Sequence, residues 1–248
     1  MTLGPLVPAD EYLHHQITDT FATVGQSDRS WTEKICAQAA ARDGTVQVHL
    51  GLGKYTNRGV LDAYAGVSRG VEQWTVRSSR PLAPDRERLG VGPIRYEVLE
   101  PLRSVRFALD ANDVVPVAFE WTFEGVVPPA LEHREVHRAP DGGRVDADIV
   151  RYHHTGVARG WVEVDGARTE IEPTSWFSTR DHSWGVRDWQ RVPYWRWFGF
   201  VSDPDNFVML NNVGLEDGGE TAGGFLMRDG ELAPIVSGQT ESELHPEL

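Results

Sequence analysis

Cysteine is almost absent from this 248-residue sequence, in which Cys36 is the only one. A single thiol forms no intramolecular disulfide, and it cannot supply the paired Cys ligands of a zinc site or a CxxC redox motif. The sequence therefore excludes a disulfide-stapled fold and a Cys-rich metal centre. Such sparse cysteine is typical of a reducing compartment, so we expect a cytoplasmic protein.

Basic residues are also in short supply. The 24 Lys and Arg residues stand against 37 Asp and Glu residues, which gives a formal net charge of −13 at pH 7. This charge repels nucleic acid and anionic lipid surfaces, so neither is expected as a partner. The N-terminal sequence lacks the basic and apolar regions of a signal peptide, and no uncharged apolar run approaches the roughly 18 residues of a membrane span. We expect no export and no integral membrane association. The sequence does not decide whether the protein forms a homodimer.

Helical periodicity is scarce as well. Short runs of alternating apolar and polar residues, bounded by Gly, Pro or Asp-Gly, recur from residue 35 onward and are typical of antiparallel sheets. The Asp-Gly pairs at 43–44, 165–166 and 229–230 tolerate the positive φ angles of tight hairpin turns. The pattern predicts an all-β fold with about fifteen strands, which exceeds one simple eight-stranded barrel. We expect an N-terminal arm over residues 1–30, a first β domain over 31–165 and a second, shorter β domain over 166–248.

The segment RDHSWGVRDW, residues 180–189, combines acidic, basic and aromatic side chains. In an extended strand, Asp181, His182 and Ser183 alternate between faces and cannot form a hydrolase triad, and the sequence has no GxSxG motif. One face would carry Asp181, Ser183, Gly185 and Arg187, and the other Arg180, His182, Trp184 and Val186. A carboxyl desolvated among aromatic residues has a raised pKa and can donate a proton near neutral pH. The alternative is a structural ion pair of Asp181 with Arg180 or Arg187.

The histidine and glycine motifs favour no cofactor. Adjacent histidines such as His153 and His154 diverge on a strand, so they form a poor metal-ligand pair. One of these two can instead assist a carboxyl in proton transfer, because the ordinary pKa of histidine is near neutral. Residues 51–54, Gly-Leu-Gly-Lys, lack the full phosphate-loop motif, and their glycines are typical of a bulge or bend in a strand. We therefore expect neither a metal nor a nucleotide.

Tryptophan, by contrast, is abundant, with nine residues in all. Five of them lie within residues 176–197, alongside other aromatic side chains. They form either an unusually aromatic core or the wall of a cavity for an apolar small molecule. We expect the substrate-binding residues to be Trp176, His182, Trp184, Arg187, Trp189, Tyr152 and Trp74.

The motif Asp181-His182-Ser183-Trp184-Gly185, with YHHTGVARGWVEVDG upstream at 152–166, resembles the lipocalin-like carotenoid hydratase and hydroxyneurosporene synthase superfamily, in particular an actinobacterial-type branch with RDHSWGVR cores. The likeness extends from DEYLHHQ near the N-terminus to RDHSWGVRDW. It implies two consecutive lipocalin-like β barrels or curled sheets. The second would be incomplete, because only about eighty residues follow residue 166.

The resemblance also implies a chemistry. Hydratases of this superfamily add water to an isoprenoid double bond without a cofactor, and the motif's Asp is the proposed acid, assisted by an upstream His. The matching catalytic residues here are Asp181 and His153 or His154. The expected function is a cofactor-independent hydratase, lyase or isomerase that protonates an apolar isoprenoid-like or polyene substrate. The alternatives are a non-catalytic lipid or terpenoid carrier and a pericyclic cyclase, because fold alone does not determine chemistry.

Overall fold

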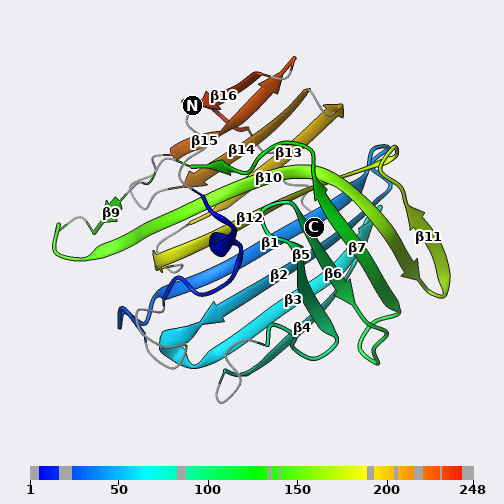
Figure 1. Cartoon of the computed structure of the whole chain (residues 1–248), viewed down its shortest axis with the longest axis horizontal. Coiled ribbons are helices and arrows are strands. Elements are labelled where there is room, and N and C mark those ends of the chain that lie inside the picture. The colour runs from blue at the N-terminus through cyan, green and yellow to red at the C-terminus, as the bar shows by residue number, and fades with distance from the viewer. Residues whose placement is uncertain are drawn as a thin grey trace. The chain divides into compact units, whose positions relative to one another are not determined.

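A computed structural model describes most of the chain, and it is built almost entirely from β strands (Figure 1). The described residues are 6–16, 24–82, 88–132, 134, 136–139, 141–188, 193–203, 206–214, 220–229 and 231–241. They contain two short 3-10 helices, η1 (Pro8–Glu11) and η2 (Thr56–Arg58), and no α-helix. The expectation of an all-β protein is confirmed. Within the same residues, no helix is long and apolar enough to cross a membrane.

The chain forms two compact units, Leu3–Arg187 and Asp188–Leu248. The first contains one large antiparallel sheet whose central path runs β4-β3-β2-β1-β12-β10-β7-β6-β5, and β8, β9 and β11 also pair with β10. Figure 1 shows the long strand β10 curving as the sheet curls. The strands are β1 (Trp31–Ala41), β2 (Val46–Tyr55), β3 (Val60–Arg69), β4 (Glu72–Pro81), β5 (Ile94–Glu100), β6 (Ser104–Leu109), β7 (Val117–Gly125), β8 (Ala130–Leu131), β9 (Val136–Arg138), β10 (Val145–Val164), β11 (Ala167–Ile171) and β12 (Trp176–Arg187).

The core of this unit covers one face of the sheet, which we call the inner face. Ile35, Ala37 and Ala39 alternate along β1 and belong to a continuous apolar cluster with Phe119 and Trp121 of β7. Alternation explains this pattern, because successive strand residues point to opposite sides. The other side of the sheet, which we call the outer face, carries Lys34 and Cys36 from the same strand.

The second unit is a separate four-stranded antiparallel sheet with the order β13-β14-β15-β16. Its strands are β13 (Trp195–Asp203), β14 (Asn206–Gly214), β15 (Glu220–Arg228) and β16 (Glu231–Ile235). This sheet occupies the C-terminal part of the range expected for a second, shorter β domain, residues 166–248. The boundary expected at residues 165–166 falls at the turn between β10 and β11, inside the first sheet. The units instead divide after Arg187, because β12 pairs with both β1 and β10.

Two of the three expected Asp-Gly turns lie within the described residues, and both are present. Asp165 and Gly166 have φ angles of 53° and 78° and join β10 to β11 directly. Gly44 has φ 76° in the turn between β1 and β2, where the Asp43 carboxylate accepts a hydrogen bond from the Thr45 backbone. Asp229 has φ 52°, but Gly230 lies outside the described residues, so this third turn stays a prediction.

Candidate functional site

Strand β12 presents opposite chemistry on its two faces, as the sequence predicted. Arg180 and His182 contact inner-face groups, including Glu11 and Tyr152. Asp181 instead lies beside Arg151 and the Cys36 backbone on the outer face. The alternation expected for an extended segment is therefore confirmed. It separates the residues of the motif into two different environments.

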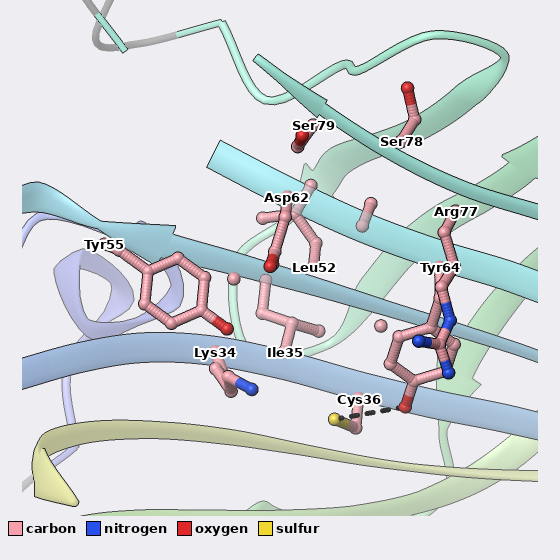
Figure 2. Close-up of a pocket in the computed structure, with 13 residues that line it drawn as sticks. Lys34, Ile35, Cys36, Leu52, Tyr55, Asp62, Tyr64, Arg77, Ser78 and Ser79 are labelled. Atoms are coloured by element: carbon pink, nitrogen blue, oxygen red, sulfur yellow. Dashed lines mark hydrogen bonds between the residues drawn. The ribbon is translucent and has the colours of Figure 1, made fainter. Parts of the chain in front are cut away.

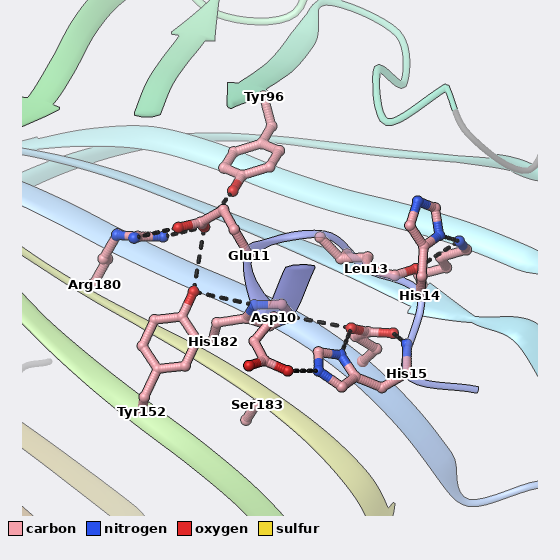
Figure 3. A network of polar contacts seen from close by, with 12 residues as sticks. Asp10, Glu11, Leu13, His14, His15, Tyr96, Tyr152, Arg180, His182 and Ser183 are labelled. Carbon is pink, nitrogen blue, oxygen red and sulfur yellow. Dashed lines mark hydrogen bonds and ion pairs between the residues drawn. The ribbon is translucent and has the colours of Figure 1, made fainter. Parts of the chain in front are cut away.

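The inner face holds a buried carboxylate, Glu11, on η1 (Figure 3). The Arg180 guanidinium donates to both of its oxygens, at 2.5 and 2.7 Å. The hydroxyls of Tyr96 and Tyr152 lie 2.9 and 3.2 Å away, and the Leu102 backbone N–H donates at 2.8 Å. Burial alone would raise the pKa of Glu11, but the charge and hydrogen bonds of Arg180 outweigh it and lower the pKa to about 2. This ion pair connects the N-terminal segment, residues 6–16, to the large sheet.

A second group of polar contacts continues from Tyr152. The Tyr152 hydroxyl lies 3.3 Å from Nδ1 of His182, whose Nε2 is 3.1 Å from Glu33. Nδ1 of His15 lies 2.6 Å from the same Glu33 oxygen, and the Trp184 ring stacks on the His15 ring at 3.6 Å between centroids. His15, His182, Trp184 and Tyr152 thus form one inner-face cluster around Glu33.

The expected substrate-binding residues that the structure describes lie in several different surroundings. On the inner side, Trp176 is buried in the core, Trp74 packs half-buried against that core, and Trp184, Tyr152 and His182 belong to the cluster described above. Arg187 lies on the outer face and donates to the Ser183 hydroxyl at 3.3 Å. Trp189 lies outside the described residues. Trp195 and Trp197, also counted in the aromatic run, stack on each other in the second unit.

A pocket of about 480 Å³ lies on the outer face of strands β1 to β4 (Figure 2). Its position follows from the register, because two rows of paired outer-face residues cross these strands. The rows are Cys36, Gly51, Tyr64 and Arg77, and Lys34, Gly53, Asp62 and Ser79. In each row β2 contributes only a glycine, and the missing side chain leaves the hollow. The described lining residues include no tryptophan.

The two glycines are necessary for the positions of the pocket side chains. A Cβ added at Gly53 would lie 2.7 Å from the Tyr55 ring and 2.9 Å from an Asp62 carboxylate oxygen. A Cβ at Gly51 would overlap the Tyr64 ring. Both distances at Gly53 are shorter than ordinary van der Waals contact. The sequence predicted that the glycines of residues 51–54 mark a bulge or bend in the strand. In the structure, Gly53 instead leaves room for the Tyr55 ring and the Asp62 carboxylate.

Burial shifts several pocket groups toward their protonated forms. Desolvation raises the pKa of Asp62, although Lys34, Tyr55 and Arg58 oppose it. Desolvation likewise raises the pKa of Tyr55, and it raises that of the Cys36 thiol to about 11. The neighbouring Cys36, followed by burial, raises the pKa of Tyr64, whose hydroxyl donates to the Cys36 sulfur at 3.7 Å. The site can therefore donate several protons or hydrogen bonds to a bound molecule.

Asp181 extends one of these rows by one strand, because it pairs with Cys36 in register. Its Oδ1 accepts the Cys36 backbone N–H at 3.2 Å, and its Oδ2 lies 3.3 Å from Nε of Arg151. The structural ion pair was expected with Arg180 or Arg187. Arg180 cannot form it, because it lies on the opposite face, whereas the charge of Arg187 does act on Asp181. Arg151, which sequence reasoning did not consider, is the paired cation.

The two expected histidine partners lie on different faces. His153 pairs with Asp181 in register, but its Nε2 lies 2.6 Å from a Glu132 oxygen. His154 lies on the inner face, where its Nε2 is 2.7 Å from the Val127 carbonyl oxygen. Burial, followed by the charge of Arg180, lowers the pKa of His154 to about 3. The structure therefore places Asp181 and His153 on the same face of the sheet and His154 on the opposite face.

Replacing Asp181 by Asn should lower the free energy of unfolding by about 1 to 3 kcal/mol, because Arg151 loses a buried ion-pair partner. Glu132, 3.2 Å from Arg151, limits the loss. Urea unfolding of the wild type and the variant measures it. An unchanged stability would argue against a structural role and favour the proton-donor assignment.

Sequence reasoning missed Lys34, Tyr55, Asp62 and Tyr64. A signal existed in GLGKY, residues 51–55, because two glycines spaced by two on one strand remove the side chains from one face. That signal identifies a gap but not the residues that fill it. The neighbours come from strands β1 and β3, and only the register places them beside the glycines.

Several solved structures share this fold. They include a candidate AttH from Nitrosomonas europaea (TM-score 0.60, 12% identity, covering 83% of this chain), kievitone hydratase from Nectria haematococca (0.56, 14%, 84%) and CghA with Sch210972 (0.52, 14%, 82%). The chain spans 68%, 65% and 59% of their respective lengths. At this identity they confirm the lipocalin-like fold, while the actinobacterial-type branch stays a prediction.

A search of curated proteins gives no match. Residues 6–194 match the model of a family described as a family of unknown function, DUF8625. The match covers the first unit with its pocket and the inner-face cluster, and thus more than half of the sequence. The chain therefore belongs to the DUF8625 family.

Proposed function

We propose that this protein is a cofactor-independent enzyme of the hydratase or cyclase type, which binds a small organic molecule in the outer-face pocket. The observation that carries the proposal is the half-buried Asp62 carboxyl in this pocket, beside Tyr55, with a raised pKa. A carboxyl of this kind remains protonated to a higher pH and can act as a general acid. One of the structures with the same fold is named a hydratase, which supports the reaction class.

In the proposed reaction, Asp62 donates its proton to one carbon of a substrate double bond. A water oxygen bonds to the adjacent carbon, which carries the developing positive charge, and the water then loses a proton that restores the Asp62 carboxyl. The net change is the addition of one water across the double bond. Tyr55 and Lys34 donate hydrogen bonds to a substrate oxygen and so hold the double bond in position beside Asp62. Each proton transfer requires Asp62 within hydrogen-bond distance of the reacting atom.

The pocket lining favours an amphipathic substrate. Most of the lining side chains carry a hydroxyl, a thiol or a charge, and Lys34 and Arg77 are cations. Such groups match a molecule with phenol, carbonyl or carboxylate oxygens. This lining differs from the aromatic wall expected for an isoprenoid-like or polyene ligand. Unsaturated phenols and enones are therefore the first substrates to test, with isoprenoid alkenes as the comparison.

A second candidate mechanism keeps Asp181 as the acid, with His153 as its neighbour. Its support is the register, which places Asp181 in the same row as Cys36 of the pocket. The ion pair with Arg151 weakens this assignment, because it gives the Asp181 carboxylate a structural role. Comparison of Asp62→Asn with Asp181→Asn separates the two mechanisms.

The function is tested by incubating the protein with the substrate panel in H₂¹⁸O, without an added cofactor. Enzyme-dependent incorporation of one ¹⁸O atom per product molecule supports a hydratase, and product of unchanged mass with a new ring supports a cyclase. Saturable binding without conversion of any panel member would favour the carrier alternative. Binding by neither compound class would contradict the pocket assignment.

Gly53→Ala should lower kcat/KM by about tenfold or more, since its methyl group would displace Tyr55 and Asp62 from their positions. Gly223→Ala is the matched control, because nothing lies within 4 Å of the added Cβ there. Melting temperatures of both variants check that the fold is retained. Equal kinetics for a well-folded Gly53→Ala variant and the wild type would place the reaction elsewhere.

A further inference from the structure

Three side chains of types that can bind a metal ion, from distant parts of the sequence, meet on the inner face. His15 comes from the N-terminal segment, Glu33 from β1 and His182 from β12. Their ligand atoms all lie within 4.8 Å of one another. A single Glu33 oxygen is 2.6 Å from Nδ1 of His15 and 3.1 Å from Nε2 of His182. Two imidazoles and one carboxylate are a common ligand set for zinc and other divalent transition metals.

The nitrogens that face away from Glu33 also have partners. Nε2 of His15 lies 3.2 Å from an Asp10 oxygen, and Nδ1 of His182 lies 3.3 Å from the Tyr152 hydroxyl. A carboxylate and a hydroxyl oxygen can each accept an N–H there, which leaves the lone pair of the other ring nitrogen directed toward Glu33. Outer partners of this kind orient histidine ligands in metalloproteins.

Ring packing fixes the two imidazoles further. Trp184 stacks on His15 with 10° between the planes, and the His15 and His182 rings are nearly perpendicular at 5.6 Å. Glu33 is fully buried, whereas the side chains of His15 and Asp10 keep 16% and 25% of their exposure. An ion can therefore approach from the solvent side of His15. The cluster is thus held in position, with Glu33 and His182 buried and His15 partly exposed.

We propose that His15, Glu33 and His182 bind a divalent transition-metal ion of the zinc class, which ties the N-terminal segment to β1 and β12. Tetrahedral ligands with bonds of about 2.1 Å are roughly 3.4 Å apart, so the His182 contact is already close and the His15 contact must lengthen by about 0.8 Å. Three protein ligands leave one position for water. The site lies on the opposite face of the sheet from the pocket. The test of metal binding is therefore independent of the proposed function.

The test uses the full chain, stripped with EDTA and dialysed free of chelator. Titration with ZnCl₂ in a calorimeter should give one ion per chain, and zinc should raise the melting temperature. Co²⁺ in place of zinc should produce visible d–d absorption of a low-coordinate site. His15→Gln should weaken binding by at least tenfold and remove the thermal shift. His49→Gln, a half-buried histidine of β2, is the control and should retain both.

Asp10→Asn provides a second variant that leaves all three ligands in place. It should weaken zinc binding by about 10- to 100-fold through the loss of the His15 orienting partner. Circular dichroism confirms that each variant is folded before titration. Failure of the wild type to bind zinc, or equal binding by the wild type, His15→Gln and Asp10→Asn, would overturn the site. The cluster would then be a hydrogen-bonded chain in which two imidazole N–H groups satisfy Glu33.

Discussion

Glu11→Gln should lower the free energy of unfolding by about 3 to 5 kcal/mol, because it leaves the Arg180 guanidinium buried without its anion. Both side chains are fully buried in the structure. Glutamine keeps the size of the side chain and one acceptor oxygen, so the loss reports mainly the missing charge. Urea unfolding at pH 7 measures the difference.

Glu72→Gln is the control for this measurement. Glu72 forms an exposed ion pair with Arg69 at 3.7 Å, and such pairs contribute less than about 1 kcal/mol. Equal effects of the two substitutions would contradict a special role for the Glu11 pair. The destabilised variant should also show faster proteolysis within the N-terminal segment, since Glu11 connects η1 to the sheet.

Lowering the pH should remove the Glu11 contribution to the free energy of unfolding in the wild type. The folded pKa of Glu11 is about 2 and its ordinary value is 4.5, so its contribution is complete above about pH 4.5 and is lost as the pH falls through about 2. The shift corresponds to about 3 kcal/mol. Glu11→Gln should show a correspondingly smaller decrease in stability across this range.

Asp62→Asn should lower kcat by about 10²- to 10⁴-fold, the usual contribution of a general acid, with little change in KM. Asparagine has nearly the same shape but no carboxyl proton. The raised pKa of Asp62 means that the fold disfavours its charge, so the neutral amide should not reduce stability. Steady-state kinetics and melting temperature on the same preparation test both parts.

Asp181→Asn provides the comparison, because its expected effect is a loss of stability. A stable Asp181→Asn variant without turnover, beside an active Asp62→Asn variant, would exchange the two roles. The carboxyl that protonates the substrate would then be the one that the motif RDHSWGVRDW predicted. Full activity of both variants would remove both carboxyls from the mechanism.

Local sequence patterns were enough to predict the all-β fold, the Asp165-Gly166 turn and the alternation of β12. Each depends on neighbouring residues, since φ preferences and the two-residue strand repeat act over short distances. The same alternation placed Arg180 and Asp181 on opposite faces before any partner was known. The sequence could not name those partners, because Glu11 precedes Arg180 by 169 residues.

The pocket and the Glu33 cluster depend on strand order. β12 lies between β1 and β10, which brings Asp181 beside Cys36 and His182 beside Tyr152. Strand order and register are set by burial of the whole apolar face, so many distant residues determine them together. The tryptophan-rich stretch at residues 176–197 also shows that closeness in sequence does not predict closeness in the fold. Its members were close in sequence, yet packing placed Trp176 in one core and Trp195 in another sheet, because a side chain's surroundings follow from the strands that pair with its own.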